Sequence, residues 1–352
     1  MVKDKGVIIT EAVMKLLTIT VPCFNSEDYM EKCINSLLIG GEEVEILIVD
    51  DGSTDRTSGI ADEYQNKYPE IIRAIHKENG GHGDAVNTGI MNATGKYFKV
   101  CDSDDWFDAS AYKKVLKTLR ELEEGGEEID LLLANYVYDK VGRKKKKVMK
   151  YAGALPEKKI IGWNDDDIKF NKFQYVLMHS VIYRTKMLKE SNLRLPKHTF
   201  YVDNIYVFKP MVNVKKLMYI NADLYHYFIG REGQSVNEQT MIKRIDQQIF
   251  INKVLIDFFS NNKDIPKQMY KFLFQYIDMM MCVSSVMCII SKDKEKLEKK
   301  RQLWDYLRIK DKELYRQLRH TIFGIWMNLP GSFGRFLSRT GYQVMQKVFG
   351  FN

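Results

Sequence analysis

The chain has 352 residues and a formal net charge of +8, which is enough length for a nucleotide-sized domain and a second portion. The chain has five cysteines, an odd number, and none of them form a CxxC pair. This set argues against a structural zinc site or a disulfide framework and favours free thiols in a reducing cytosol. Residues 291–352 hold 14 Lys or Arg against 6 Asp or Glu, which confines the excess charge to the C-terminal tail. Such a tail is compatible with an anionic membrane surface, a polyanionic acceptor or water alone. No nucleic-acid partner is expected.

Residues 1–13 lack the apolar core of a secretory signal, and we expect them to be a disordered extension. Strands and helices then alternate, with β-branched apolar runs for the strands and helical spacing of apolar residues for the helices. Strands are expected at Leu16–Val21, ended by Pro22, at Val44–Val49, at Ile71–Ile75 and from Tyr97, and helices at Met30–Leu38, at Thr57–Tyr64 and from the glycine turn to Ile90. This alternation predicts an α/β fold whose mostly parallel sheet is flanked by helices, with ligands outside the carboxyl ends of the strands.

The pattern changes beyond Asp108. One more amphipathic helix is expected, followed by an antiparallel pair of strands at Ile129–Tyr138 and Lys145–Tyr151. From about Thr240 the pattern is predominantly helical. The most apolar stretch, Phe272–Ile290, contains polar interruptions, which predicts a buried core helix rather than a membrane span.

An acidic cluster follows the predicted strand at Tyr97. Asp102, Asp104 and Asp105 lie in four consecutive positions, and a strand that ends here releases Asp102 and Asp104 into a loop where both can converge. Hard oxygen ligands of this kind suit Mg²⁺ or Mn²⁺, especially when substrate phosphates complete the coordination shell. The alternative is that the cluster only caps the helix that begins near Ala109.

Four motifs occur in this order along the chain: Val21-Pro22-Cys23-Phe24-Asn25, Val49-Asp50-Asp51-Gly52-Ser53-Thr54-Asp55, Asn79-Gly80-Gly81 with Asn87-Thr88-Gly89, and Asp102-Ser103-Asp104-Asp105. Their residues, order and spacing resemble the successive motifs of family 2 glycosyltransferases. The resemblance is strong over the first third of the chain and looser to about residue 235. It implies a GT-A fold, a nucleotide-diphosphate sugar donor, a divalent cation (Mn²⁺ or Mg²⁺) and inversion at the anomeric carbon.

The resemblance implies a donor site at the strand ends. Phe24 borders the nucleobase after Pro22, and either Asp50 or Asp51 accepts the imide N–H of uracil; an ordinary core Phe and an ordinary turn are the alternatives. The glycine turn brings backbone amides to phosphate at a helix start. The other donor-binding candidates are Asn25, Asn79, Gly81, Asn87, Asp102 and Arg231.

One position departs from the family pattern. Where many relatives carry Ala-Arg-Asn, this chain has Ala85-Val86-Asn87, so a cationic contact to the donor is missing. His82 is interpreted as a turn histidine, with partial replacement of that contact as the alternative. The departure puts donor affinity or donor choice in doubt.

The resemblance also assigns catalytic roles. It places Asp104 on the metal, Asp102 on the ribose or the metal's water, and Asp203 as the base that takes the acceptor proton. Helix capping is the alternative for Asp203. Further candidates are His226 for the metal, Arg231 for the diphosphate, and His179 and Arg184 for the acceptor pocket, with core packing as the alternative for His226.

The sequence thus predicts transfer of one sugar from a UDP-sugar to a hydroxyl of a cell-surface glycan or lipid-linked precursor. The QxxRW signature of processive synthases is absent. The predicted units are a donor-binding half at 14–125, an acceptor half at 126–238, and a helical, basic region at 239–352. We expect a cytoplasmic protein. Its aromatic and basic C-terminal segment has the composition of an interfacial helix that docks at the inner membrane face, and packing on its own domain or a dimer contact is the alternative. The rival functions are a sugar-nucleotide nucleotidyltransferase and a non-catalytic nucleotide- or membrane-binding module.

Overall fold

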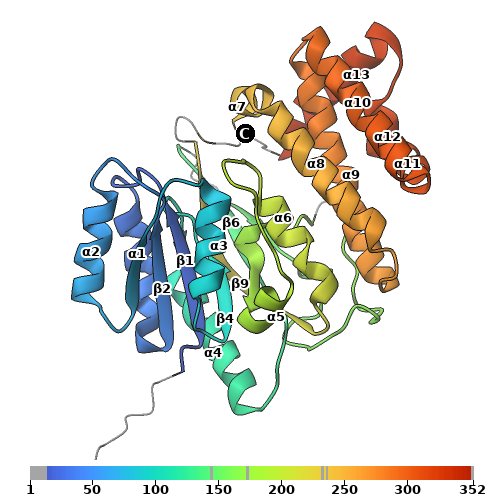
Figure 1. Ribbon diagram of the computed structural model, residues 1–352. Coiled ribbons are helices and arrows are strands. Elements are labelled where there is room, and N and C mark those ends of the chain that lie inside the picture. The colour runs from blue at the N-terminus through green and yellow to red at the C-terminus, as the bar shows by residue number, and fades with distance from the viewer. Residues whose placement is uncertain (1–13, 143–145, 172–173, 231–233, 235–236, 350–352) are drawn as a thin grey trace, which may run out of the picture.

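The computed structural model describes residues 14–349 apart from 143–145, 172–173, 231–233 and 235–236, so the expected extension at 1–13 lies outside the described residues. Nine strands form a single sheet in the order β3-β2-β1-β4-β8-β6-β9-β5, with β7 paired to β6 (Figure 1). The strands are β1 (Leu17–Cys23), β2 (Val44–Asp50), β3 (Ile72–His76), β4 (Tyr97–Val100), β5 (Trp106–Phe107), β6 (Leu131–Lys140), β7 (Lys147–Met149), β8 (Val181–Arg184) and β9 (Leu217–Ile229).

Most strands of the sheet run in one direction. The block β3-β2-β1-β4 is parallel throughout, and β6 and β9 are also parallel to each other. The strands β5, β7 and β8 are antiparallel to their neighbours, and the pairing of β6 with β7 matches the predicted antiparallel pair. The prediction of an α/β fold with a mostly parallel sheet is confirmed.

The first strand passes through Pro22 instead of ending there. Pro22 is in register with Val49 of β2, and β1 ends at Cys23. Proline is tolerated because the ladder between β1 and β4 stops at the pair Thr20 and Val100, so β1 is a local edge on that side.

Helices cover both faces of the sheet and then form a further layer. In the sheet-forming part they are α1 (Met30–Leu37), α2 (Thr57–Lys67), α3 (His82–Asn92), α4 (Ala109–Glu124), α5 (Thr185–Glu190) and α6 (Asp203–Phe208). Short 3₁₀ turns occur at Leu38–Glu43, Met178–Ser180 and Pro210–Asn213. One apolar core lies between the sheet and α1, α2 and α4, and a second lies on the opposite face under α3, α5 and α6.

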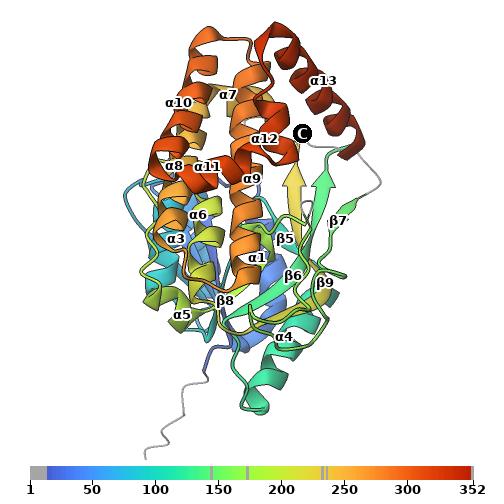
Figure 2. The same cartoon turned by 90° about the vertical axis from the view of Figure 1, so that its right-hand side faces the viewer.

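The C-terminal region consists of helices, as predicted from its pattern. They are α7 (Glu238–Lys243), α8 (Ile245–Asn261), α9 (Lys267–Ile290), α10 (Lys294–Lys310), α11 (Lys312–Arg319), α12 (Ile322–Met327) and α13 (Gly331–Phe349). Figure 2 shows α8 and α9 next to α6, and side chains of these helices belong to the same apolar core as Val86 of α3 and Phe98 of β4. The helical region is therefore continuous with the sheet through a shared core.

Among the described residues, α9 is the one helix with the length and composition of a membrane span. However, 67% of its most apolar window is buried inside the protein. Burial against α8 and α10 explains its apolar sequence without a membrane, as a core helix requires.

Candidate active site

The loop after β1 is fixed to its neighbours and leaves an aromatic ring exposed. Asn25 has a left-handed φ of 48°, and its Oδ1 accepts a hydrogen bond of 2.9 Å from Thr54 N. Ser26 Oγ lies 2.8 Å from Ser103 Oγ, which joins this loop to the acidic loop after β4. Phe24, which precedes both residues, is 52% exposed. Phe24 is therefore no core residue, and its ring is accessible to a planar ligand.

The Asp51 carboxylate organises the glycine turn. Its Oδ1 accepts from Gly80 N at 3.0 Å and from Lys77 Nζ at 2.7 Å, and its Oδ2 accepts from Gly81 N at 2.7 Å. Asn79 Nδ2 donates to the backbone oxygen of Asp51 at 2.9 Å. The amides that were expected to meet phosphate are thus bonded to a carboxylate of the protein itself.

Asp50 lies on the other side of the same strand end. Its Oδ1 accepts from Ser53 N at 3.0 Å, and its Oδ2 lies 3.1 Å from His76 Nδ1. His76 Nε2 lies 3.0 Å from Asp62 Oδ1. The hydrogen bond with Asp50 is the largest of the influences that raise the pKa of His76, so the imidazolium form is favoured between the two carboxylates.

Glycines allow a distant segment to lie on the start of α3. Gly81 has a φ of 82°, and a Cβ there would lie 3.0 Å from His198 N. A Cβ on Gly83 would lie 2.8 Å from Pro196 O, which is closer than real Cβ contacts. The chain before α6 therefore needs these glycines in order to approach the sheet edge.

Asn87 secures the same segment. Its Nδ2 donates to Leu195 O at 2.8 Å and its Oδ1 accepts from Leu195 N at 3.0 Å. The nitrogen and the oxygen of this buried carboxamide are both bonded to Leu195. Asn87 therefore positions the chain that leads to Asp203 and does not face a nucleotide-sugar.

His82 and Asp102 form an ion pair at the carboxyl end of β4. The distance from His82 Nε2 to Asp102 Oδ1 is 2.8 Å. Burial lowers the pKa of His82, but the charge of Asp102, its hydrogen bond and the charges of Asp203 and Asp104 outweigh burial, and the pKa is raised. The interpretation of His82 as a plain turn histidine is wrong, since the ring lies among the predicted catalytic carboxylates.

Asp203 is the first residue of α6 and is half-buried. Burial raises the pKa of its carboxyl to about 6, with Asp102 adding to the shift and His82 opposing it. The N-cap of this helix is Val202, so Asp203 stands at the first helical position and not at the cap. The structure thus brings Asp203 within electrostatic reach of Asp102 and gives it a pKa suited to a general base near neutral pH.

The next residue connects the site to the C-terminal helices. Asn204 Oδ1 accepts hydrogen bonds from Tyr175 Oη at 3.0 Å and from Tyr276 Oη of α9 at 3.1 Å. Its Nδ2 donates to Tyr201 O at 2.9 Å. The start of α6, and with it Asp203, is therefore held in place from the helical region.

Asp105 faces inward and holds β9 against the acidic loop. Tyr225 Oη donates to its Oδ2 at 2.6 Å, and Phe228 N donates to its Oδ1 at 2.8 Å. Burial raises the pKa of Asp105 well above its usual value, with contributions from Asp104 and Asp102. Both oxygens bond inside the protein, which gives Asp105 a structural function beside any contact with a metal ion.

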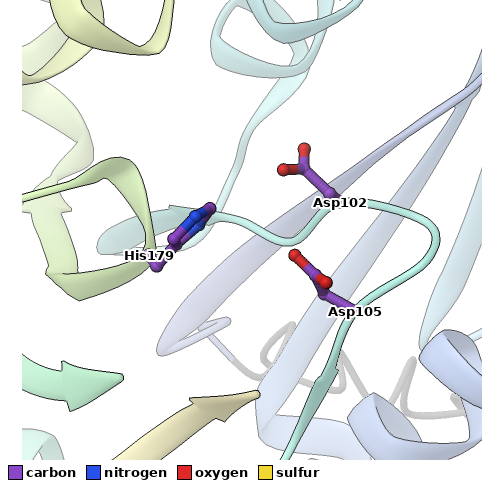
Figure 3. A group of neighbouring side chains, drawn as sticks. All are labelled: Asp102, Asp105 and His179. Carbon is purple, nitrogen blue, oxygen red and sulfur yellow. The ribbon is translucent and has the colours of Figure 1, made fainter. Parts of the chain in front are cut away.

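A donor set for a metal ion lies at the end of β4. Asp102, Asp105 and His179 each offer one ligand atom, and these atoms lie within 4.8 Å of one another (Figure 3). Burial lowers the pKa of His179 to about 4, so the ring is neutral, and its Nδ1 has no hydrogen-bond partner. Carboxylate oxygens fit Mn²⁺ or Mg²⁺, and an imidazole nitrogen favours Mn²⁺ of these two. Asp104, also partly exposed, lies on the same loop.

His179 was predicted to line an acceptor pocket, but it lies beside Asp102 and is packed between aromatic rings. Its centroid lies 4.5 Å from that of Tyr225 and 4.3 Å from that of Tyr227. Its backbone oxygen accepts from the fully buried Lys99 Nζ at 2.7 Å. Burial lowers the pKa of Lys99 to about 7.

Two other candidates are not brought to this site. His226 stacks on Trp106 and lies 3.2 Å from Asp139 Oδ2, on the opposite face of β9 from Tyr225, so the structure does not present it to the acidic loop. Arg184 pairs with Asp130 at 2.7 Å, at the start of β4 rather than at its carboxyl end. A third candidate, Arg231, lies outside the described residues.

The comparisons with known proteins agree with this geometry. Residues 18–190 match the family model described as Glycosyl transferase family 2. The chain contains a family 2 glycosyltransferase domain. It is similar to the putative glycosyltransferase EpsH of Bacillus subtilis (strain 168), at 27% identity over 252 residues, which are 66% of this chain and 64% of EpsH.

A second relative is the poly(ribitol-phosphate) beta-N-acetylglucosaminyltransferase TarS of Staphylococcus aureus (strain Mu50 / ATCC 700699). Identity is 26% over 228 residues, which are 64% of this chain but only 37% of TarS, so the family 2 chain described here spans well under two thirds of that protein. The crystal structure of TarS 1-349 in complex with UDP-GlcNAc superposes with a TM-score of 0.51 at 20% identity, covering 86% of this chain and 90% of that one.

The mannosyltransferase PcManGT from Pyrobaculum calidifontis, in complex with GDP-Man and Mn²⁺, has a TM-score of 0.50 at 14% identity. The match covers 94% of this chain and 86% of that one. At such low identity both structural matches establish the shared fold, which is the predicted GT-A fold with an added helical region.

Proposed function

We propose that the protein is an inverting glycosyltransferase that moves one sugar from a UDP-sugar to an acceptor hydroxyl. The observation that carries this proposal is the meeting of Asp102 and Asp203 around His82 at the carboxyl ends of the strands. Ligands of parallel sheets bind at this edge. TarS was crystallised with UDP-GlcNAc, which makes a UDP-sugar the first donor to test.

Asp203 is the proposed base. Its pKa of about 6 leaves it largely ionised at neutral pH, and a carboxylate in that state takes the acceptor proton as the new glycosidic bond forms. The pKa of His82 is raised by the neighbouring carboxylates, and its positive charge opposes protonation of Asp203. Direct attack from the side opposite the leaving group gives inversion.

The proposed metal ligands are Asp102 and Asp104, which are partly exposed, and the neutral His179 ring lies beside Asp102. A bound Mn²⁺ or Mg²⁺ supplies Lewis-acid neutralisation of the charge on the departing nucleoside diphosphate. Phe24 is the proposed platform for uracil, and Asp50 and Asp51 lie at the neighbouring strand end.

We further propose a cell-surface glycan or its lipid-linked precursor as the acceptor, and a cytoplasmic site of action at the membrane. TarS acts on poly(ribitol-phosphate) according to its name, which supports an envelope polymer. The helices α12 and α13 expose Ile322, Ile325, Trp326, Phe333 and Phe336. Arg335 and Arg339 lie among them on α13, a composition that suits an anionic lipid surface.

Release of UDP from a panel of nucleotide sugars, with and without Mn²⁺, tests the enzyme directly. Slow, metal-dependent hydrolysis of one UDP-sugar without acceptor is expected. Binding without any turnover would instead support the non-catalytic module, and turnover of a sugar phosphate with UTP would support the nucleotidyltransferase. The absence of a basic glycine-rich loop after β1 argues against the latter.

A further inference from the structure

Arg244 lies stacked on an aromatic ring where the C-terminal helices begin. The Arg244 guanidinium carbon is 3.5 Å from the centroid of the Phe200 ring. Its Nη1 is buried without a hydrogen-bond partner, and within the described part of the chain Arg244 forms no ion pair. Buried polar groups in native proteins nearly always have a partner, either protein or ordered water, so this nitrogen has an unused capacity to donate a hydrogen bond.

The pair lies on the base side of the site. Phe200 is three residues before Asp203, and Phe200 N donates to Gln247 Oε1 of α8 at 2.7 Å. The charges of Arg244 and Asp203 both act on the hydroxyl of Tyr201, whose pKa is raised to about 12 by burial. Tyr201 itself has a left-handed φ of 65°, so the chain turns sharply between the platform and the base.

The chemistry of the pair specifies the ligand. Stacking occupies one face of the guanidinium and leaves its N–H groups in the plane, where they match two oxygens of a phosphate. The positive end of α8, which begins at Ile245, adds to the attraction for an anion. The nearest acidic residue in sequence, Asp246, is already paired with Lys299 at 2.9 Å. Phe200 is 39% exposed, so the platform is open to a large acceptor.

We propose that Arg244 and Phe200 form an acceptor subsite that binds a phosphate group of the acceptor beside the base. This inference rests on the proposed glycosyltransferase function and names the acceptor class as a phosphate-bearing one. The phosphate can belong to a polyol-phosphate polymer or to a lipid carrier, and both present the same anionic oxygens to Arg244.

Calorimetric titration with glycerol 3-phosphate, in the presence of UDP and Mn²⁺, tests the subsite. R244Q is expected to bind glycerol 3-phosphate at least tenfold more weakly than the wild type. R244K is expected to lose part of this affinity, because lysine keeps the positive charge but lacks the two parallel N–H donors of the guanidinium. The matched control is R308Q, because Arg308 is an exposed arginine paired with Asp305 on α10. UDP affinity should be equal in all four proteins, which also shows that the variants are folded.

Farnesyl phosphate in place of glycerol 3-phosphate distinguishes the two sources. Stronger, Arg244-dependent binding of farnesyl phosphate assigns the phosphate to a lipid carrier, and equal affinities assign it to a polymer or glycan. Unchanged affinity in R244Q, or an equal loss in R308Q, overturns the subsite. Loss of the subsite with intact hydrolysis of a UDP-sugar leaves the proposed function standing, whereas a wild-type protein without hydrolysis removes the function whatever the titration gives.

Discussion

Different interactions stabilise the part of the molecule from β1 to β5 and the helical C-terminal region. In the first, backbone amides and side chains of adjacent loops already satisfy the acidic groups, as Gly80 and Gly81 do for Asp51. In the second, apolar packing dominates, and only a few polar contacts reach the site, such as that between Tyr276 and Asn204. The difference teaches that the proposed donor site is formed locally, whereas the proposed base Asp203 is positioned from far along the chain.

The largest expected effect comes from the residue where the two regions meet. Asp203→Asn removes the proposed base, and transfer should fall by about 10²–10⁴-fold. UDP affinity should not change, because Asp203 is not a donor contact. Initial rates of sugar transfer and calorimetric titration with UDP measure the two properties. Wild-type transfer in this variant would remove Asp203 from the mechanism.

The pH dependence of the transfer rate also tests Asp203 as the base. The base acts only when deprotonated, and its pKa is about 6 because of burial, so the rate should rise with pH through that value and then level off. In the Asp203→Asn variant, the rate should not show this rise with pH. A wild-type rate that is flat between pH 5 and 7 contradicts the assignment.

The Phe24→Ala variant tests the proposed donor site. Aromatic stacking with a base contributes about 1–3 kcal/mol, so UDP affinity should fall by roughly 5- to 150-fold. Since Phe24 is exposed, the free energy of unfolding should change by no more than about 0.5 kcal/mol. Met91→Ala is the matched control, because Met91 is an exposed apolar residue on α3 with 58% accessibility. Equal UDP affinities of the two variants would place the base elsewhere.

Tyr276→Phe separates positioning from stability. It deletes one hydrogen bond to Asn204, and loss of about 1 kcal/mol in unfolding free energy is expected, with up to about a tenfold fall in kcat. Tyr270→Phe removes a bond of similar length, to Gln317, within the helical region. Urea denaturation should show a similar loss for both variants. If kcat falls equally in both, the helical region contributes only stability.

The smallest effect on folding is expected on the outer face of α12 and α13. Phe333→Ser with Phe336→Ser should shift the unfolding free energy by less than about 1 kcal/mol in total, since both rings are exposed. Flotation with vesicles containing phosphatidylglycerol should show reduced binding of the double variant. Val141→Ser, also at an exposed apolar residue but distant in sequence, serves as the control. Equal flotation of all three proteins argues against docking through this face.

Sequence reasoning succeeded where a local pattern determines structure. The parallel strands, the helices between them and the helical tail were predictable from periodicity, and the motif order indicated the family. It failed for His82, whose neighbours in sequence are glycines and whose partner Asp102 lies 20 residues away, in the loop after β4. It also failed to foresee that Asn87 and Asp105 bond within the protein, because their partners Leu195 and Tyr225 are more than 100 residues away.

The choice between the two histidines illustrates the same limit. The sequence placed His226 at the metal and His179 in the acceptor pocket, yet His226 stacks on Trp106 and His179 lies beside Asp102. Alternation along β9 decides this, and its register shifts against β6 near Asn135. A register shift of this kind cannot be seen in the sequence.

The bond from α9 to Asn204 bears on how the molecule matures during synthesis. The loops that carry Asp51 and Asp102 are synthesised in the first third of the chain, but the support for Asp203 arrives only with Tyr276. A nascent chain that ends before α9 therefore lacks one of the hydrogen bonds that hold the start of α6. On the proposed mechanism, the alignment of Asp203 is completed late, after the helices that continue the core have been synthesised.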